Sequence, residues 1–123
     1  MEQVLIIDDD ELVRFTLREI METFGHQVTE ARNGREGIAI FKTGQFDIIL
    51  TDIVMPEMDG IEVIQEIRQR DMSVPIIAIS GSGGAFKMQH LEIARKAGAT
   101  KIMSKPFKPD ELINAVEECL PAE

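Results

Sequence analysis

Five polar residues in this chain have side chains whose chemistry belongs together, and they lie at or just beyond the ends of short apolar runs. They are Asp8, Asp9, Asp52, Ser80 and Lys105. Clustered carboxylates repel one another unless a cation or raised pKa values relieve them. Hard oxygen ligands of this kind suit magnesium. With a hydroxyl and an ammonium group beside them, the set predicts a site that needs a divalent cation and accepts an anion.

These side chains come together if the apolar runs before them are strands of one parallel sheet. A fifth, weakly alternating segment fits an edge strand, so the predicted strands are residues 4–7, 27–31, 46–51, 76–79 and 101–104. The carboxyl ends of parallel strands lie at one edge of a sheet, where ligands bind. Five strands alternating with five helices predict a doubly wound α/β fold, with helices on both faces of the sheet.

The helix predicted after the first strand has a cap, a stop and one apolar face. Asp9 or Asp10 can cap its N-terminus, and Gly25 follows as its stop. Apolar residues recur on one face, at Val13, Leu17, Ile20, Met21 and Phe24. Asp59 and Pro109 are in the same way expected at the starts of later helices.

Each polar residue also has a simpler interpretation. Asp52 alone could cap a turn, and a lysine such as Lys105 most often lies at the surface. Three acids in a row can be a helix cap with solvated neighbours, but a cap needs one acid, and that explains Asp10 only. Residues 80–84 are rich in glycine but lack the Lys-Ser or Lys-Thr ending of a P-loop, which makes them a weak nucleotide motif.

The chain has 123 residues, of which 44% are apolar and 28% charged, the size and composition of one globular domain. We therefore expect residues 1–123 to form a single domain. The formal net charge of -9 repels phosphate backbones and anionic membranes and disfavours direct nucleic-acid binding. The sequence has no apolar run long enough for a membrane span and no basic signal-peptide start. The expected location is the cytoplasm, without membrane attachment.

In order and spacing, these motifs resemble the receiver domain of bacterial two-component response regulators. The resemblance covers essentially the whole chain and rests on Asp8-Asp9, on Asp52 followed by Met55-Pro56 and Asp59-Gly60, on Ser80, and on Lys105-Pro106-Phe107. It implies a flavodoxin-like fold with strand order 2-1-3-4-5. It also implies a phosphoacceptor signalling domain rather than a conventional turnover enzyme, and a stand-alone receiver is the simplest form.

The resemblance assigns a role to each site residue. Asp52 would accept a phosphoryl group from the phosphohistidine of a sensor histidine kinase or a histidine phosphotransfer protein. Mg²⁺ would be bound by Asp9, by Asp52 and by the backbone carbonyl of Val54, and by Asp8 through water. Lys105, after a cis peptide bond to Pro106, and Ser80 would bind the phosphoryl oxygens. Phosphorylation would then switch a protein-interaction surface toward a downstream target that the sequence does not identify.

Two other functions share parts of this pattern. A haloacid-dehalogenase-like phosphatase also uses an aspartyl nucleophile, magnesium and a lysine, but it needs a second aspartate two places after the nucleophile. Val54 holds that place after Asp52, and Asp10 holds it after Asp8 but without a threonine two residues further on. A flavodoxin-like or nucleotide-binding domain needs a glycine-rich or hydroxyl-rich loop after the first strand. The three aspartates there, beginning at Asp8, would repel its phosphate.

Overall fold

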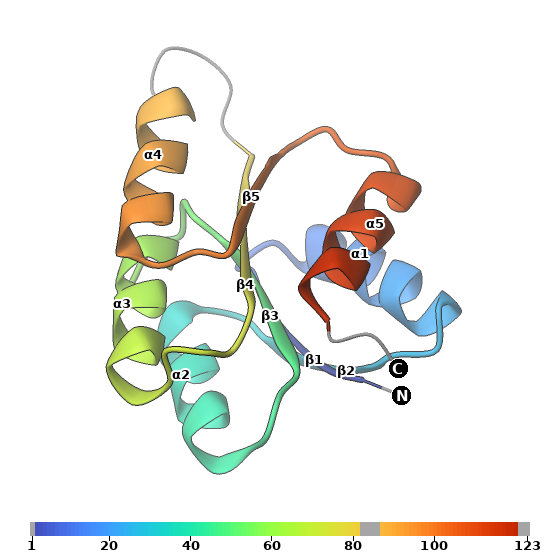
Figure 1. Ribbon diagram of the computed structural model, residues 1–123, viewed down its shortest axis with the longest axis horizontal. Coiled ribbons are helices and arrows are strands. Elements are labelled where there is room, and N and C mark those ends of the chain that lie inside the picture. Colours follow the sequence, from blue (N-terminus) through green and yellow to red (C-terminus); the bar gives the residue numbers. More distant parts are fainter. Residues whose placement is uncertain (1, 82–86, 121–123) are drawn as a thin grey trace.

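A five-stranded parallel sheet forms the centre of the computed structural model, which describes residues 2–81 and 87–120 (Figure 1). The strand order is β2-β1-β3-β4-β5, as the resemblance implies. Sequence periodicity predicted these strands to within two residues of their ends. Their bounds are β1 (Gln3–Ile7), β2 (Gln27–Ala31), β3 (Ile48–Asp52), β4 (Ile76–Ser80) and β5 (Lys101–Ser104).

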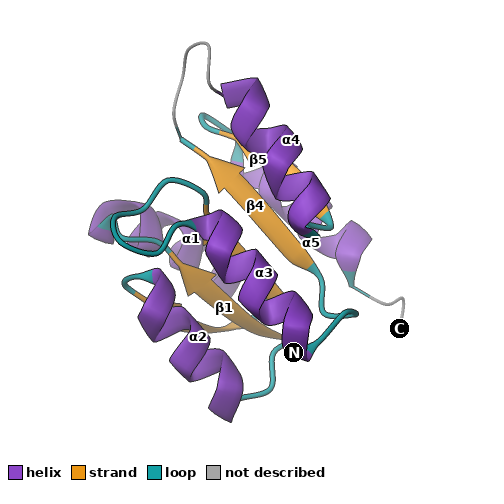
Figure 2. Ribbon diagram, turned by 90° about the vertical axis from the view of Figure 1, so that its left-hand side faces the viewer, coloured by secondary structure: helices purple, strands orange, loops and turns teal. Residues whose placement is uncertain are grey.

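Five helices cover the two faces of the sheet. Two of them pack on one face and three on the other, an arrangement that can be followed in Figures 1 and 2. The first pair is α1 (Glu11–Thr23) with α5 (Pro109–Cys119), and the other three are α2 (Gly34–Thr43), α3 (Gly60–Arg70) and α4 (Lys87–Ala97). This arrangement confirms the predicted doubly wound α/β fold.

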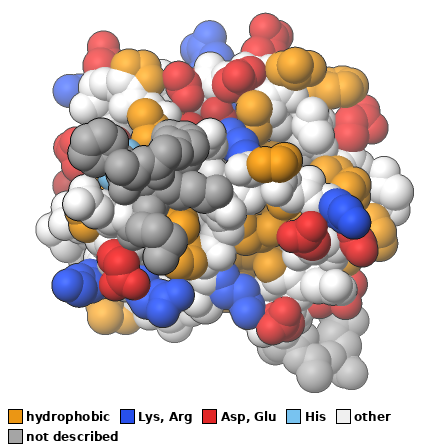
Figure 3. Space-filling view, turned by 90° about the horizontal axis from the view of Figure 1, so that it is seen from above, with side chains coloured by type: hydrophobic (Ala, Val, Ile, Leu, Met, Phe, Trp, Pro, Cys, Tyr) orange, Lys and Arg blue, Asp and Glu red, His pale blue; other side chains and the backbone are white. Residues whose placement is uncertain are grey.

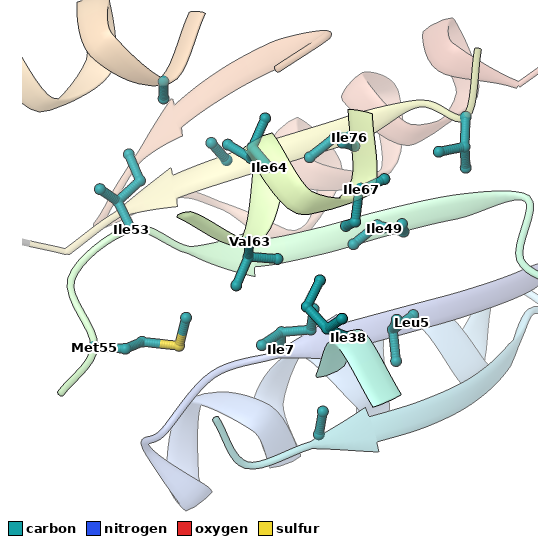
Figure 4. Close-up of a cluster of buried hydrophobic side chains, with 14 residues drawn as sticks. Leu5, Ile7, Ile38, Ile49, Ile53, Met55, Val63, Ile64, Ile67 and Ile76 are labelled. Carbon is teal, nitrogen blue, oxygen red and sulfur yellow. The ribbon is translucent and has the colours of Figure 1, made fainter. Parts of the chain in front are cut away.

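The core has two apolar layers, one on each face of the sheet. Every residue of β3 and β4 is buried, which explains why these strands are continuous apolar runs rather than alternating ones. Figure 4 shows the layer under α2, α3 and α4, where Ile7 and Ile49 of the sheet pack against Ile38 and Val63 of the helices. The rigid sheet between these layers fixes where its carboxyl edge presents polar residues.

Helix α1 differs from its prediction in two positions. Its cap is the expected one, because Asp10 Oδ1 accepts hydrogen bonds from the amides of Leu12 and Val13, at 2.9 and 3.3 Å. The placement of Phe24 on the buried face is wrong, since the helix ends at Thr23 and the Phe24 side chain is 53% exposed. The inner face contains Arg14 instead, next to Leu17 and Met21.

No helix in the described part of the chain is long and apolar enough to cross a lipid bilayer. Residues 82–84 of the glycine-rich stretch lie outside the described residues.

Candidate functional site

The predicted site residues lie together at the carboxyl edge of the sheet. Asp52 and Ser80 are the last residues of the neighbouring strands β3 and β4, while Asp8 and Lys105 directly follow β1 and β5. The main chain ties two of these exits together, because the Lys105 amide donates to the Ser80 carbonyl at 2.8 Å. Seen from above, acidic side chains gather on this face with a basic side chain beside them (Figure 3).

Three carboxylates form the centre of the site. Asp8, Asp9 and Asp52 each offer an oxygen, and these three oxygens lie within 4.8 Å of one another. Asp8 and Asp52 are buried, with exposed fractions of 2% and 8%, whereas Asp9 is exposed. Within the described residues, Oδ1 of Asp52 is buried and accepts no hydrogen bond. An orphaned buried oxygen beside two further carboxylates is a donor set that fits a hard divalent cation.

Burial governs the electrostatics of these acids. It raises the pKa of Asp52 to about 7, and the neighbouring charge of Asp8 adds to this rise. The pKa of Asp8 is also raised, again mainly by burial, although a hydrogen bond from the Asp10 amide and the charge of Lys105 oppose the shift. A raised pKa means that the charged form of the carboxylate is disfavoured, because too few positive charges or hydrogen-bond donors offset its burial. The site is therefore prepared for an additional positive charge.

Lys105 lies beside the carboxylates. Its Nζ forms an ion pair with Asp8 Oδ2 at 3.6 Å, and about a quarter of its side chain is exposed. The Lys105–Pro106 peptide bond is cis, as the resemblance implies. Gly81 makes room for the lysine, because a Cβ atom at this position would lie 3.2 Å from Nζ.

The segment after β3 folds back onto Asp52. The Ile53 amide donates to the Ile79 carbonyl at 3.1 Å, and the Ile53 carbonyl accepts from the Gly60 amide at 2.8 Å. A Cβ atom on Gly60 would lie 2.1 Å from the Asp52 carbonyl oxygen, so only glycine fits there. In this segment between β3 and α3, the backbone of Glu57 adopts the left-handed conformation, with φ of 68°. The backbone of Asp52 is thus held by β4 on one side and by the start of α3 on the other.

Two further predicted site residues take different positions around Asp52. Ser80 is fully buried at the end of β4, and Val54, two residues after Asp52, is 50% exposed. Asp8, Asp9, Asp52, Ser80 and Lys105 all lie at this edge, so the structure brings together the residue types that the sequence motifs selected.

Arg14 is a site neighbour that the motifs did not reveal. It is only 8% exposed, and its Nη1 donates to the Asp8 carbonyl at 2.8 Å. The available signal is its spacing, because positions 14, 17 and 21 share one face of α1. A charged residue at an inward position is unusual unless it is paired.

Comparisons with known proteins agree with this geometry. A family model described as response regulator receiver domain matches residues 4–117. The chain is 39% identical over 120 residues to the chemotaxis protein CheY of Halobacterium salinarum, covering 98% of both chains. It is 31% identical to sporulation initiation phosphotransferase F of Bacillus subtilis, covering 98% of this chain and 94% of that one. A solved structure of the response regulator TrrA from Thermotoga maritima, in complex with Mg²⁺-BeF, has a TM-score of 0.86 and 30% identity, covering 98% of this chain and 100% of that one.

Proposed function

This chain belongs to the response regulator receiver domain family of two-component systems, and on that premise we propose that Asp52 is its phosphoacceptor. The observation that carries the proposal is the state of Asp52. Its carboxylate ends the central strand β3, with one buried oxygen that accepts no hydrogen bond from the described residues. Two more carboxylates and the Lys105 ammonium lie around it. A nucleophilic carboxylate needs a free lone pair, and the end of β3 places Asp52 at the carboxyl edge of the sheet.

In the proposed reaction an oxygen of ionised Asp52 attacks the phosphorus of a phosphohistidine. The new O–P bond forms as the N–P bond breaks, and the imidazole leaves with the electron pair and takes up a proton. The product is an aspartyl phosphate. Because the pKa of Asp52 is raised to about 7 in the metal-free protein, only part of the population holds the reactive carboxylate at neutral pH.

We propose Mg²⁺ as the cofactor, held by Asp9 and Asp52, by the Val54 backbone carbonyl, and by Asp8 through water. When bound, the ion offsets the repulsion between the carboxylates and the incoming phosphoryl oxygens. The three mutually close carboxylate oxygens support this assignment, as does the Mg²⁺-BeF complex of the related TrrA. Asp8 is buried, and its Oδ1 accepts a hydrogen bond from the Asp10 amide at 2.9 Å.

Lys105 and Ser80 would bind the remaining phosphoryl oxygens. Lys105 reaches the site with a positive charge, and the Ser80 hydroxyl comes from the neighbouring strand end. Phosphorylation would draw Ser80 toward the phosphoryl group and bias the loop and helix that follow β4, which switches a protein-interaction surface. Ile102 of β5 is aliphatic, so any coupling through this position would depend on repacking of its side chain rather than on a hydrogen bond.

The phosphodonor we propose is a sensor histidine kinase or a histidine phosphotransfer protein in the cytoplasm. A groove between α1 and the segment after β5 runs directly beside Lys105, and its lining includes Leu12 and Phe107. Leu12 and Phe15 of α1 are 72% and 57% exposed. An exposed apolar side chain such as Leu12, in a groove that Lys105 also lines, suits a protein donor better than a small metabolite. Neither nucleic acid nor membrane is proposed as a direct partner of this acidic chain.

The test uses phosphoramidate, a small donor with the same N–P bond, together with Mg²⁺. We expect the intact mass of the protein to rise by one phosphoryl group, and the adduct to be lost in mild base, as an acyl phosphate is. Asp52→Asn should show no such adduct, and omission of Mg²⁺ should abolish it in the wild type. An adduct that persists in Asp52→Asn would assign the acceptor role to another residue. Turnover of p-nitrophenyl phosphate would show a phosphatase instead of a signalling domain.

A further inference from the structure

The backbone and side chain of Asp8 are held by four separate partners. Its amide donates to the Ala31 carbonyl at 3.2 Å, and its carbonyl accepts from Arg14 at 2.8 Å. Its Oδ1 accepts from the Asp10 amide at 2.9 Å, and its Oδ2 lies 3.6 Å from Lys105 Nζ. Three of these partners belong to the main chain or to the site already described. Arg14 is the one that the proposed reaction does not use.

The guanidinium of Arg14 connects Asp8 to the neighbouring strand. While Nη1 donates to the Asp8 carbonyl, Nε donates to Glu30 Oε1 at 3.2 Å. Glu30 lies on β2, and its second oxygen accepts from Arg18 Nη1 at 2.6 Å. The Arg14 side chain is 10% exposed and Glu30 is 28% exposed, so this ion pair is partly shielded from water. A planar guanidinium can hold two acceptors in a fixed geometry, which an ammonium cannot do.

We propose that Arg14, held by Glu30, is a positioning residue that fixes the Asp8–Asp9 peptide and so aims the carboxylates of Asp8 and Asp9 at a shared cation. The peptide unit is planar, so fixing the Asp8 carbonyl also fixes the Asp9 amide and the direction in which the chain reaches the Asp9 Cα. Asp9 is exposed, and no described packing of its own side chain immobilises it. The hydrogen bond from Arg14 therefore restricts the position of Asp9, the proposed ligand whose side chain is exposed.

The action of Arg14 is geometric. Its guanidinium bonds a backbone oxygen of Asp8 rather than the carboxylate, and Glu30 compensates its charge. Removing it would leave the buried Asp8 carbonyl without this donor and free the β1–α1 connection to shift. Outer partners of metal ligands typically change metal affinity by about 10-fold to 100-fold when they are lost. This inference rests on the proposed magnesium site.

The experiment measures Mg²⁺ affinity by isothermal titration calorimetry at constant ionic strength, at a temperature where circular dichroism shows each variant to be folded. Arg14→Met should bind Mg²⁺ about 10-fold more weakly than the wild type or worse. Arg18→Met is the matched control, because it removes the other partner of Glu30 from the same helix without touching Asp8. Its affinity should stay within about twofold of the wild type, since a half-exposed ion pair contributes little.

Arg14→Lys separates positioning from packing and serves if Arg14→Met does not fold. It keeps the charge and the aliphatic stem but cannot hold Glu30 and the Asp8 carbonyl together, so its affinity should lie between those of Arg14→Met and the wild type. Wild-type affinity in a folded Arg14→Met or Arg14→Lys variant would overturn the positioning role and leave the magnesium site intact. Equal losses in the Arg14 and Arg18 variants would overturn it as well. Failure of the wild type to bind Mg²⁺ would overturn the metal site and this inference together.

Discussion

Replacing Asp52 by asparagine is expected to stabilise the metal-free protein, by an amount that depends on pH. The folded-state pKa of Asp52 is raised from 3.8 to about 7, mainly by burial and then by the charge of Asp8. An acid with a raised pKa binds its proton more tightly in the folded state. Protonation of Asp52 therefore contributes fully to the unfolding free energy below pH 3.8. This contribution falls as the pH rises from 3.8 and is lost once the pH has passed about 7. Asparagine cannot ionise and escapes this loss.

The size of the effect follows from the two pKa values. The interval from 3.8 to about 7 corresponds to about 4 kcal/mol of unfolding free energy, at about 1.4 kcal/mol per pH unit. We therefore expect Asp52→Asn to exceed the wild type by about 2 to 4 kcal/mol at about pH 8, and by less than about 1 kcal/mol at about pH 4. Adding Mg²⁺ at the higher pH should stabilise the wild type and reduce the difference, because the ion compensates the carboxylate that asparagine lacks.

The assay is urea unfolding followed by circular dichroism, since the chain has no Trp or Tyr to report by fluorescence. Asp71→Asn is the matched control, because hydrogen bonds from Ser73 lower the pKa of Asp71 and predict the opposite sign. That variant should be less stable than the wild type both at about pH 8 and at about pH 4, because the contribution of a lowered pKa is lost only as the pH falls below 3.8. An Asp52→Asn variant that is no more stable than the wild type at the higher pH would refute the argument.

Three further substitutions test the segment that follows β3. Val54 is half exposed near Asp52, and its side chain offers no hydrogen bond to an attacking water. Val54→Asn should therefore speed loss of the phosphoryl group about tenfold or more, measured by phosphate release. An equal or slower rate would show that other residues control the access of water to the phosphorus. Gly60→Ala should lower the unfolding free energy by about 2 to 3 kcal/mol in urea titrations, because the alanine Cβ would meet the Asp52 carbonyl. A loss under about 1 kcal/mol would show that the backbone shifts at little cost to relieve this contact. Glu57→Gly should raise the unfolding free energy by up to about 1 kcal/mol by relieving the positive φ, and a less stable variant would contradict that reading of its backbone.

The residues of the candidate site could be selected from the sequence because their signals are local. A polar residue after an apolar run predicts a strand end, and the parallel topology then places Asp8, Asp52 and Ser80 at one edge of the sheet. The cap at Asp10 and the cap at Asp59, whose Oδ1 accepts from the Glu62 amide at 2.9 Å, were predictable for the same reason.

The remaining features depend on tertiary contacts that no local pattern encodes. Arg14 faces inward because Glu30, on another strand, can pair with its charge. Phe24 leaves the apolar face because α1 ends one residue earlier. Position 60 requires glycine because a Cβ atom there would meet the Asp52 carbonyl, a contact that the predicted helix start at Asp59 does not reveal. The raised pKa of Asp52 likewise arises from burial under elements that are distant in the sequence.

The most direct test of the account identifies the phosphorylated residue itself. The protein is treated with phosphoramidate and Mg²⁺, reduced with borohydride, which converts an aspartyl phosphate to homoserine, digested, and sequenced by mass spectrometry. The account predicts homoserine at position 52, with Asp8, Asp9 and Asp59 unchanged and with no product in Asp52→Asn. Homoserine at any of the other aspartates in the wild type, with Asp52 intact, would contradict it.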